Sequence, residues 1–187
     1  METETVQKQK EKLQQLLIKD AYFREKITLS SGKESDYYID ARLTTLNPQG
    51  AYLTAKVMLD MVKNDSFVAI GGPTLGADPL IGALGVLGLQ MGLSFQTFII
   101  RKAAKSHGKQ KQIEGPELKA GSHVILIDDV ATTGKAFLQS LDVLEPMNIN
   151  VVKAICIVDR GEGAKEALAE RGCELHAIFE ASDIHKP

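Results

Sequence analysis

Two adjacent aspartates, Asp128 and Asp129, follow an apolar run at Val124–Ile127 and precede the hydroxyl-rich turn Thr132–Gly134. A helix that begins after such a turn offers free backbone N–H groups to an anion, and threonine hydroxyls add further donors. Paired carboxylates repel a phosphate, so they suit sugar hydroxyls or a divalent cation instead. The segment therefore indicates a site for a phosphorylated sugar with free hydroxyl groups. The alternative is a polar turn with an aspartate cap.

A second group of charges lies in one loop. Its basic residues are Arg101, Lys102, Lys105, His107, Lys109 and Lys111. No acidic residue occurs between Asp78 and Glu114, in a chain whose formal net charge is −2. A lysine-rich lid neutralises negative charge as it develops on a leaving pyrophosphate. The alternatives are a solvated basic loop or a nucleic-acid patch.

Arg160 comes shortly after another apolar run, Val151–Val158, and is followed by Gly161 and Gly163. The planar fork of an arginine matches a carboxylate in bidentate fashion. Taken alone, such an arginine is a surface residue in a turn. A glycine-rich loop at Gly71–Pro79 is suited to placing backbone amides against pyrophosphate. Tyr37 and Tyr38 are as compatible with the core as with the wall of a base site.

The segment 124–136 resembles the phosphoribosyl pyrophosphate (PRPP) signature of type I phosphoribosyltransferases. In that family the two acids hold the ribose hydroxyls and the loop amides bind the 5-phosphate. The basic loop resembles the catalytic loop of orotate phosphoribosyltransferases, in which an arginine matching Arg160 and a threonine matching Thr132 bind orotate. The resemblance implies transfer of ribose 5-phosphate from PRPP to orotate, giving orotidine 5′-phosphate and pyrophosphate in pyrimidine (UMP) biosynthesis.

The resemblance also assigns roles to individual residues. It implies catalytic roles for Lys105, Asp128 and Asp129, with Lys105 the leading one. The residues implied to bind PRPP are Arg101, Lys102, Lys105, His107, Asp128, Asp129, Val130, Ala131, Thr132, Thr133, Gly134, Lys135 and Ala136. Mg²⁺ is the implied cofactor, held mainly by the substrate rather than by protein side chains.

The same resemblance implies a homodimer. Arg101, Lys105 and His107 are expected to reach the partner's active site, while Lys102 serves its own, so two sites are shared. Two positions depart from the family pattern: relatives often have lysine at Ser30, and some have it at Gly76.

Two rival functions remain open. A purine phosphoribosyltransferase shares the diphosphate signature but has no use for a carboxylate clamp at Arg160. A non-catalytic regulator that binds nucleic acid needs a basic face outside the lid, which the near-neutral charge disfavours.

Strands alternating with helices predict an α/β fold with a mostly parallel sheet flanked by helices. The expected strands are 67–70, 95–100, 124–127, 151–158 and 175–179, and the expected helices are 5–18, 47–63, 79–91, 136–145 and 164–170. Ligands collect beyond the carboxyl ends of such strands. We expect one type I phosphoribosyltransferase domain over residues 1–187, with an N-terminal hood at about 1–45 and a core at about 46–187.

Composition excludes several other classes of protein. The 187 residues are 44% hydrophobic and 25% charged, which excludes disorder and a collagen-like chain. Two cysteines are too few for a disulfide framework, so a reducing cytoplasm is the default. The polar N-terminus is no signal peptide, and the uncharged stretch 79–100 is too broken by glycine and polar residues to span a bilayer. We expect neither a membrane nor a nucleic-acid partner.

Overall fold

A six-stranded sheet lies at the centre of the protein, with strand order β10-β9-β8-β5-β6-β7. The computed structural model describes residues 5–28, 32, 34–103 and 112–185. The strands are β5 (Ala69–Pro73), β6 (Gln96–Ile100), β7 (Ile113–Glu114), β8 (His123–Ala131), β9 (Asn150–Asp159) and β10 (Leu175–Glu180). Every neighbouring pair is parallel except β6 and β7. The predicted mostly parallel sheet is confirmed.

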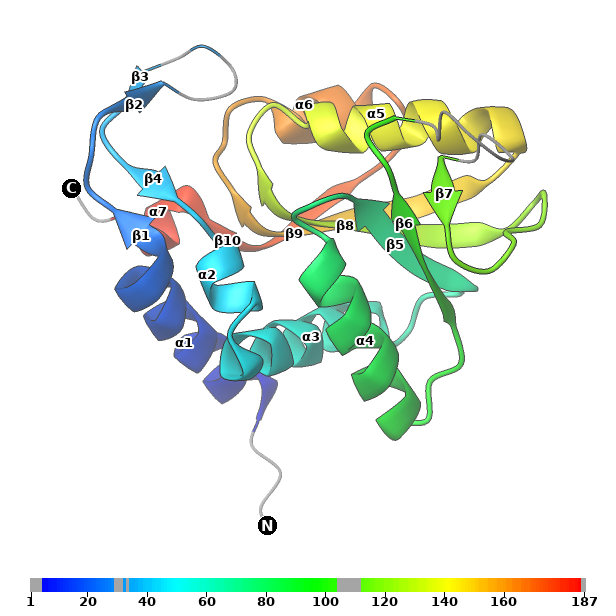
Figure 1. The fold of residues 1–187 in the computed structure, drawn as a ribbon, viewed down its shortest axis with the longest axis horizontal. Coiled ribbons are helices and arrows are strands. Elements are labelled where there is room, and N and C mark those ends of the chain that lie inside the picture. Colours follow the sequence, from blue (N-terminus) through cyan, green and yellow to red (C-terminus); the bar gives the residue numbers. More distant parts are fainter. Residues whose placement is uncertain (1–4, 29–31, 33, 104–111, 186–187) are drawn as a thin grey trace.

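Helices cover both faces of this sheet (Figure 1). One face carries α1 (Val6–Leu16), α3 (Pro48–Val62) and α4 (Asp78–Gln90), and the other carries α5 (Lys135–Leu144) and α6 (Ala164–Ala169). β8 contributes apolar side chains to both faces of the sheet, because successive side chains of a strand point to opposite faces. Ile125 and Ile127 pack with the first group of helices, and Val124 and Leu126 pack with the second.

Two small antiparallel sheets stand apart from the central one in the N-terminal quarter. α1 continues into a π-helical turn at Leu17–Ala21. β1 (Tyr22–Phe23) then pairs with β4 (Tyr38–Ile39), and β2 (Ile27–Thr28) pairs with β3 (Glu34–Ser35). The short helices α2 (Arg42–Thr45) and α7 (Ala181–Ile184) and a 3₁₀ turn at Glu145–Met147 complete the described elements. The division into hood and core near residue 45 stays a prediction.

The start of α3 agrees with the sequence. Asn47 is the N-cap, and its Oδ1 accepts hydrogen bonds from the backbone N–H groups of Gln49 at 2.9 Å and Gly50 at 3.4 Å. Pro48 occupies the first helical position, where its missing N–H costs nothing.

The strand predicted at 67–70 is misplaced. β5 covers Ala69–Pro73, so Gly71 and Gly72 lie inside the strand rather than in a loop. A Cβ on Gly71 would run into Phe98, and one on Gly72 would run into the carbonyl of Ile127. Close packing between strands requires these glycines, and sequence pattern alone does not distinguish that use from a turn.

β8 is longer than predicted. It continues beyond Ile127 to Ala131, and its pairing with β9 matches Asp128 to Cys156 and Ala131 to Asp159. The two aspartates therefore lie within the strand, near its carboxyl end, rather than after it. Within the described residues, no helix is long and apolar enough to cross a membrane.

Candidate active site

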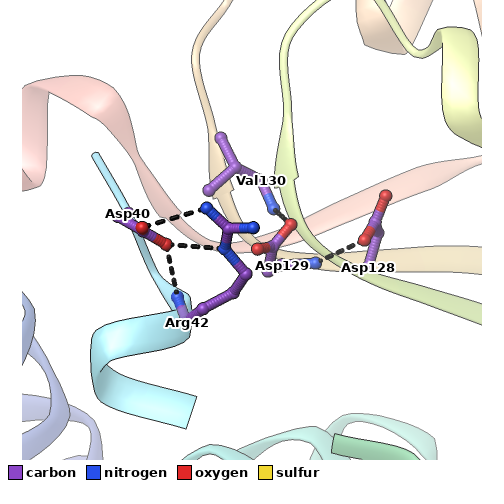
Figure 2. A network of polar contacts seen from close by, with 5 residues as sticks. All are labelled: Asp40, Arg42, Asp128, Asp129 and Val130. Carbon is purple, nitrogen blue, oxygen red and sulfur yellow. Dashed lines mark hydrogen bonds and ion pairs between the residues drawn. The ribbon is translucent and has the colours of Figure 1, made fainter. Parts of the chain in front are cut away.

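The aspartate pair borders a cavity of about 390 Å³ at the carboxyl end of β8. The N–H of Asp129 donates to Oδ1 of Asp128 at 2.9 Å, and the N–H of Val130 donates to Oδ1 of Asp129 at 2.7 Å (Figure 2). These backbone contacts fix both carboxylates against the strand.

Burial and mutual repulsion shift the titration of this pair. Burial raises the pKa of Asp128 well above its ordinary value, and the neighbouring Asp129 charge raises it further. Burial also raises the pKa of Asp129, but the Val130 N–H and the Arg42 cation act in the opposite direction. The pair therefore carries one negative charge more readily than two until a cation or a set of donors enters the cavity.

The segment from the end of β8 to the start of α5 brings part of the predicted PRPP set to this cavity. Val130, Thr132 and Ala136 line it. Gly134 has a φ of +76° and precedes the first residue of α5, as its sequence context predicts. The side chain of Ala131 is buried in the core. The remaining members of the run, Thr133, Gly134 and Lys135, are not among the cavity's lining residues.

Arg160 follows the last residue of β9 and lies at the junction of two cavities. It lines the cavity of the aspartates and a second one of about 580 Å³, whose other lining residues come mainly from β2, β3 and the residues next to them. Its N–H donates to the carbonyl of Ala131 at 2.9 Å, which ties its turn to β8. Its side chain is only 4% exposed. Sequence reasoning left a surface position open, and the structure places this arginine inside instead.

Three groups hold the Arg160 guanidinium. Nε donates to Oε1 of Glu162 at 3.1 Å, and Nη2 donates to Oγ of Ser35 at 3.0 Å. The ring of Tyr37 lies under the guanidinium, with its centroid 4.3 Å from Cζ. The Tyr37 ring also stacks on the imidazole of His185, at 4.4 Å between centroids, and lies 6.0 Å from the ring of Tyr22. Tyr37 thus joins the hairpins to the functional end of β9, a role that the sequence left undecided.

The basic loop is described only at its two ends. Lys102 lines the cavity of the aspartates. Arg101 pairs with Glu114 instead, with 3.2 Å between Nη1 and Oε1, and its backbone bonds to Gln112. Lys105 and His107 lie outside the described residues, as do Ser30 and Lys33.

Sequence reasoning missed one cation of this cavity, Arg42, the first residue of α2. Its Nε and Nη2 donate to the two carboxylate oxygens of Asp40 at 2.8 and 3.0 Å, and its backbone N–H donates to Oδ1 of Asp40 at 3.2 Å. These bonds hold the pKa of Asp40 below its ordinary value. The guanidinium lies between Asp40 and Asp129 (Figure 2). The only sequence signal was an acid and an arginine two residues apart.

Gly76 faces the aspartate pair from the loop between β5 and α4. A Cβ at this position would collide with Oδ1 of both Asp128 and Asp129. The two carboxylate oxygens therefore converge on one point. They are hard ligands of the kind that Mg²⁺ takes one or two at a time beside substrate phosphates. No group of three or more metal-ligating side chains occurs in the described part of the chain.

Comparison with known proteins gives a consistent result. Residues 52–176 match the phosphoribosyl transferase domain family. The orotate phosphoribosyltransferase of Thermosynechococcus vestitus is 40% identical over 175 residues, which cover 94% of this chain and 92% of that protein. The Streptomyces avermitilis enzyme of the same name is 42% identical over 152 residues, with 81% and 83% covered.

The fold agrees with these matches. The crystal structure of Mycobacterium tuberculosis orotate phosphoribosyltransferase in complex with PRPP superimposes with a TM-score of 0.78 at 30% identity. The alignment covers 94% of this chain and 98% of that one.

Proposed function

The chain belongs to the orotate phosphoribosyltransferase family, and from this premise we propose how its residues divide the reaction among them. The enzyme transfers ribose 5-phosphate from PRPP to orotate, giving orotidine 5′-phosphate and pyrophosphate in pyrimidine biosynthesis. A ring nitrogen of orotate releases its proton to solvent and forms a bond to the anomeric carbon of ribose as the bond from that carbon to the pyrophosphate oxygen breaks. The electron pair of the broken bond leaves with pyrophosphate.

One observation carries the assignment of roles: the aspartate pair, Thr132 and Arg160 line the same cavity. Asp128 and Asp129 accept hydrogen bonds from the ribose hydroxyls. The segment from Val130 to Ala136 binds the 5-phosphate, because it contains the N-terminal, positive end of α5. Arg160 binds the orotate carboxylate with help from Thr132. Together these contacts align the nitrogen with the anomeric carbon, and alignment of this kind supplies a large share of the rate.

Cations of the basic loop stabilise the charge that develops on pyrophosphate. Lys102 lines the cavity already. Lys105 is the proposed leading catalytic residue, with Arg101 and His107 beside it, on the basis of the sequence resemblance. Electrostatic stabilisation of a leaving group by such donors is worth about 3–4 kcal/mol per contact in a water-excluded site.

Mg²⁺ is the proposed cofactor. The converging oxygens of Asp128 and Asp129 fit its preference, and substrate oxygens complete its ligand set. When bound, the ion neutralises part of the diphosphate charge.

The proposed assembly is a homodimer in which the loops are shared between sites. Exposed apolar side chains on one face of α4 support an interface: Val86 is 64% exposed and Leu89 is 77% exposed, three residues apart. Tyr52 on α3 is exposed as well. The cytoplasmic location and the absence of a nucleic-acid partner stay predictions.

A panel of acceptor bases tests this function. Purified protein is incubated with PRPP, Mg²⁺ and, in turn, orotate, uracil, hypoxanthine, adenine and xanthine. We expect pyrophosphate release with orotate, and Arg160→Gln should lose this activity selectively. Turnover with a purine would instead identify a purine phosphoribosyltransferase. Tight nucleic-acid binding without any turnover would identify a regulator.

A further inference from the structure

The Asp40–Arg42 pair has no role in the assignments above, yet it occupies the wall of the same cavity. Three hydrogen bonds to Asp40 fix the arginine, and its side chain remains 39% exposed. An arginine buried for packing alone would not present its charge to a ligand cavity. This arginine is therefore both held in place and accessible.

The donors that Asp40 leaves unused indicate what Arg42 binds. Asp40 takes the Nε and Nη2 edge of the guanidinium, and among the described residues Nη1 of Arg42 has no hydrogen-bond acceptor. A guanidinium has five N–H groups in a fixed fork, so Nη1 keeps two donors for an anion. Phosphate oxygens are a preferred partner of this group.

The charges that line the cavity give Arg42 a reason to bind an anion. Its described acidic residues are Asp40, Asp128 and Asp129, and its described basic residues are Arg42, Lys102 and Arg160. Arg160 is already bonded to Glu162. The part of the wall at Thr74–Gly76 carries no charged side chain, and Gly76 has no room for one because the two carboxylates fill the space.

We propose that Arg42 binds the diphosphate of PRPP directly and that Asp40 is a positioning residue for it. The inference rests on the proposed function, since it assigns one more contact to the same donor. Arg42 supplies positive charge from the N-terminal part of the chain, beside Asp129. The loop before α4 cannot supply it, because a side chain at Gly76 would collide with the two aspartates. Lys102 supplies it from the end of the basic loop.

Steady-state kinetics of Arg42→Gln, Arg42→Lys and Asp40→Asn test the proposal, together with calorimetric titration of pyrophosphate in the presence of Mg²⁺. For Arg42→Gln we expect the KM for PRPP and the Kd for pyrophosphate to rise on the order of tenfold, as for loss of one charge-assisted hydrogen bond. The KM for orotate should stay within about twofold. Arg42→Lys keeps the charge and should be less impaired. Asp40→Asn should shift the PRPP constant in the same direction.

Arg171→Gln is the matched control, because Arg171 also pairs with two acidic residues, Asp142 and Glu145, but outside the cavity. It should leave both KM values unchanged. An Arg42→Gln enzyme with an unaltered PRPP constant would overturn the proposal. So would a lowered melting temperature with parallel rises in both KM values, which indicates a structural role. Wild-type protein that binds neither PRPP nor pyrophosphate would instead refute the proposed function itself.

Discussion

Asp128 places a titratable carboxyl where the folded protein disfavours its charge. Its pKa is raised by burial and by the Asp129 charge. The folded state therefore holds the proton more tightly than the unfolded chain, whose aspartates titrate near about 3.9. The contribution of Asp128 to the free energy of unfolding is therefore fully present below the unfolded-state pKa. It is lost as the pH rises through the higher folded-state pKa.

Asp128→Asn should remove this pH-dependent loss. We expect the variant to be more stable than wild type by about 1–2 kcal/mol at pH 8, with the difference shrinking toward pH 4. Turnover should fall sharply because a ribose ligand is lost. Urea unfolding of the ligand-free protein between pH 4 and 8 measures the first effect. Asp60→Asn, on the surface of α3, is the control, and a stability gain that does not vary with pH would contradict the assignment.

Glu162 stands where a substrate carboxylate is proposed to bind. Its Oε1 accepts from Nε of Arg160, and both side chains are largely buried. The Glu162 carboxylate and the orotate carboxylate would repel each other beside the same guanidinium. Glu162→Gln removes this repulsion and should lower the KM for orotate about threefold or more. The KM for PRPP should be unchanged. Glu166→Gln, exposed on α6, loses the same charge and serves as control. A higher orotate KM would mean that Glu162 holds Arg160 in place rather than competing for it.

At the scale of elements, regular patterns gave reliable predictions and short irregular pieces did not. The apolar runs that became β6, β8, β9 and β10 and the capped start of α3 were all predictable. β7 pairs antiparallel with β6 through two residues, which is too short for a periodic signal. The Asp40–Arg42 pair was not predicted for a related reason, because α2 is four residues long and has no amphipathic repeat.

The site was predictable where one segment of chain contains it. Asp128, Asp129 and Thr132 are close in sequence and share a cavity. The contacts of Arg160 with Ser35 and Tyr37 join residues more than a hundred positions apart, and only the fold brings these together. The roles of Lys105 and His107, in the loop between β6 and β7, rest on the sequence resemblance alone.

Gly134 lies between β8 and α5, and substituting it tests the packing at this junction. Its φ of +76° disfavours any side chain, and an added Cβ would press on Leu168 and Ala164 of α6. Gly134→Ala should destabilise the protein by about 1–3 kcal/mol. Gly85 lies within α4, and there a Cβ would meet Thr97 at an ordinary 3.4 Å. Gly85→Ala should therefore stabilise by about 0.5–1 kcal/mol. Thermal unfolding of the two variants measures both changes in stability. Melting temperatures that shift equally and in the same direction would contradict the packing described at the β8–α5 junction.

At the scale of the whole molecule, the proposed dimer separates two halves of one active site. The aspartates stand near the carboxyl end of β8 in the central sheet, and Asp128 is buried there. The basic loop connects β6 to β7, the edge strand of that sheet. If Lys105 reaches the partner's site, each site needs Asp129 from one chain and Lys105 from the other. Neither single variant then contains a complete site in its own homodimer.

Mixing Lys105→Ala and Asp129→Ala subunits distinguishes shared from separate sites. Equal amounts that exchange freely give roughly half mixed dimers, and each mixed dimer contains one site with both residues intact and one with neither. Specific activity should recover to roughly a quarter of the wild-type value. If the loop serves its own subunit, every site in the mixture lacks one residue and the activity stays at the level of the single variants. Sedimentation of the mixture checks that dimers form, and a fully active monomer of wild-type protein would contradict shared sites directly.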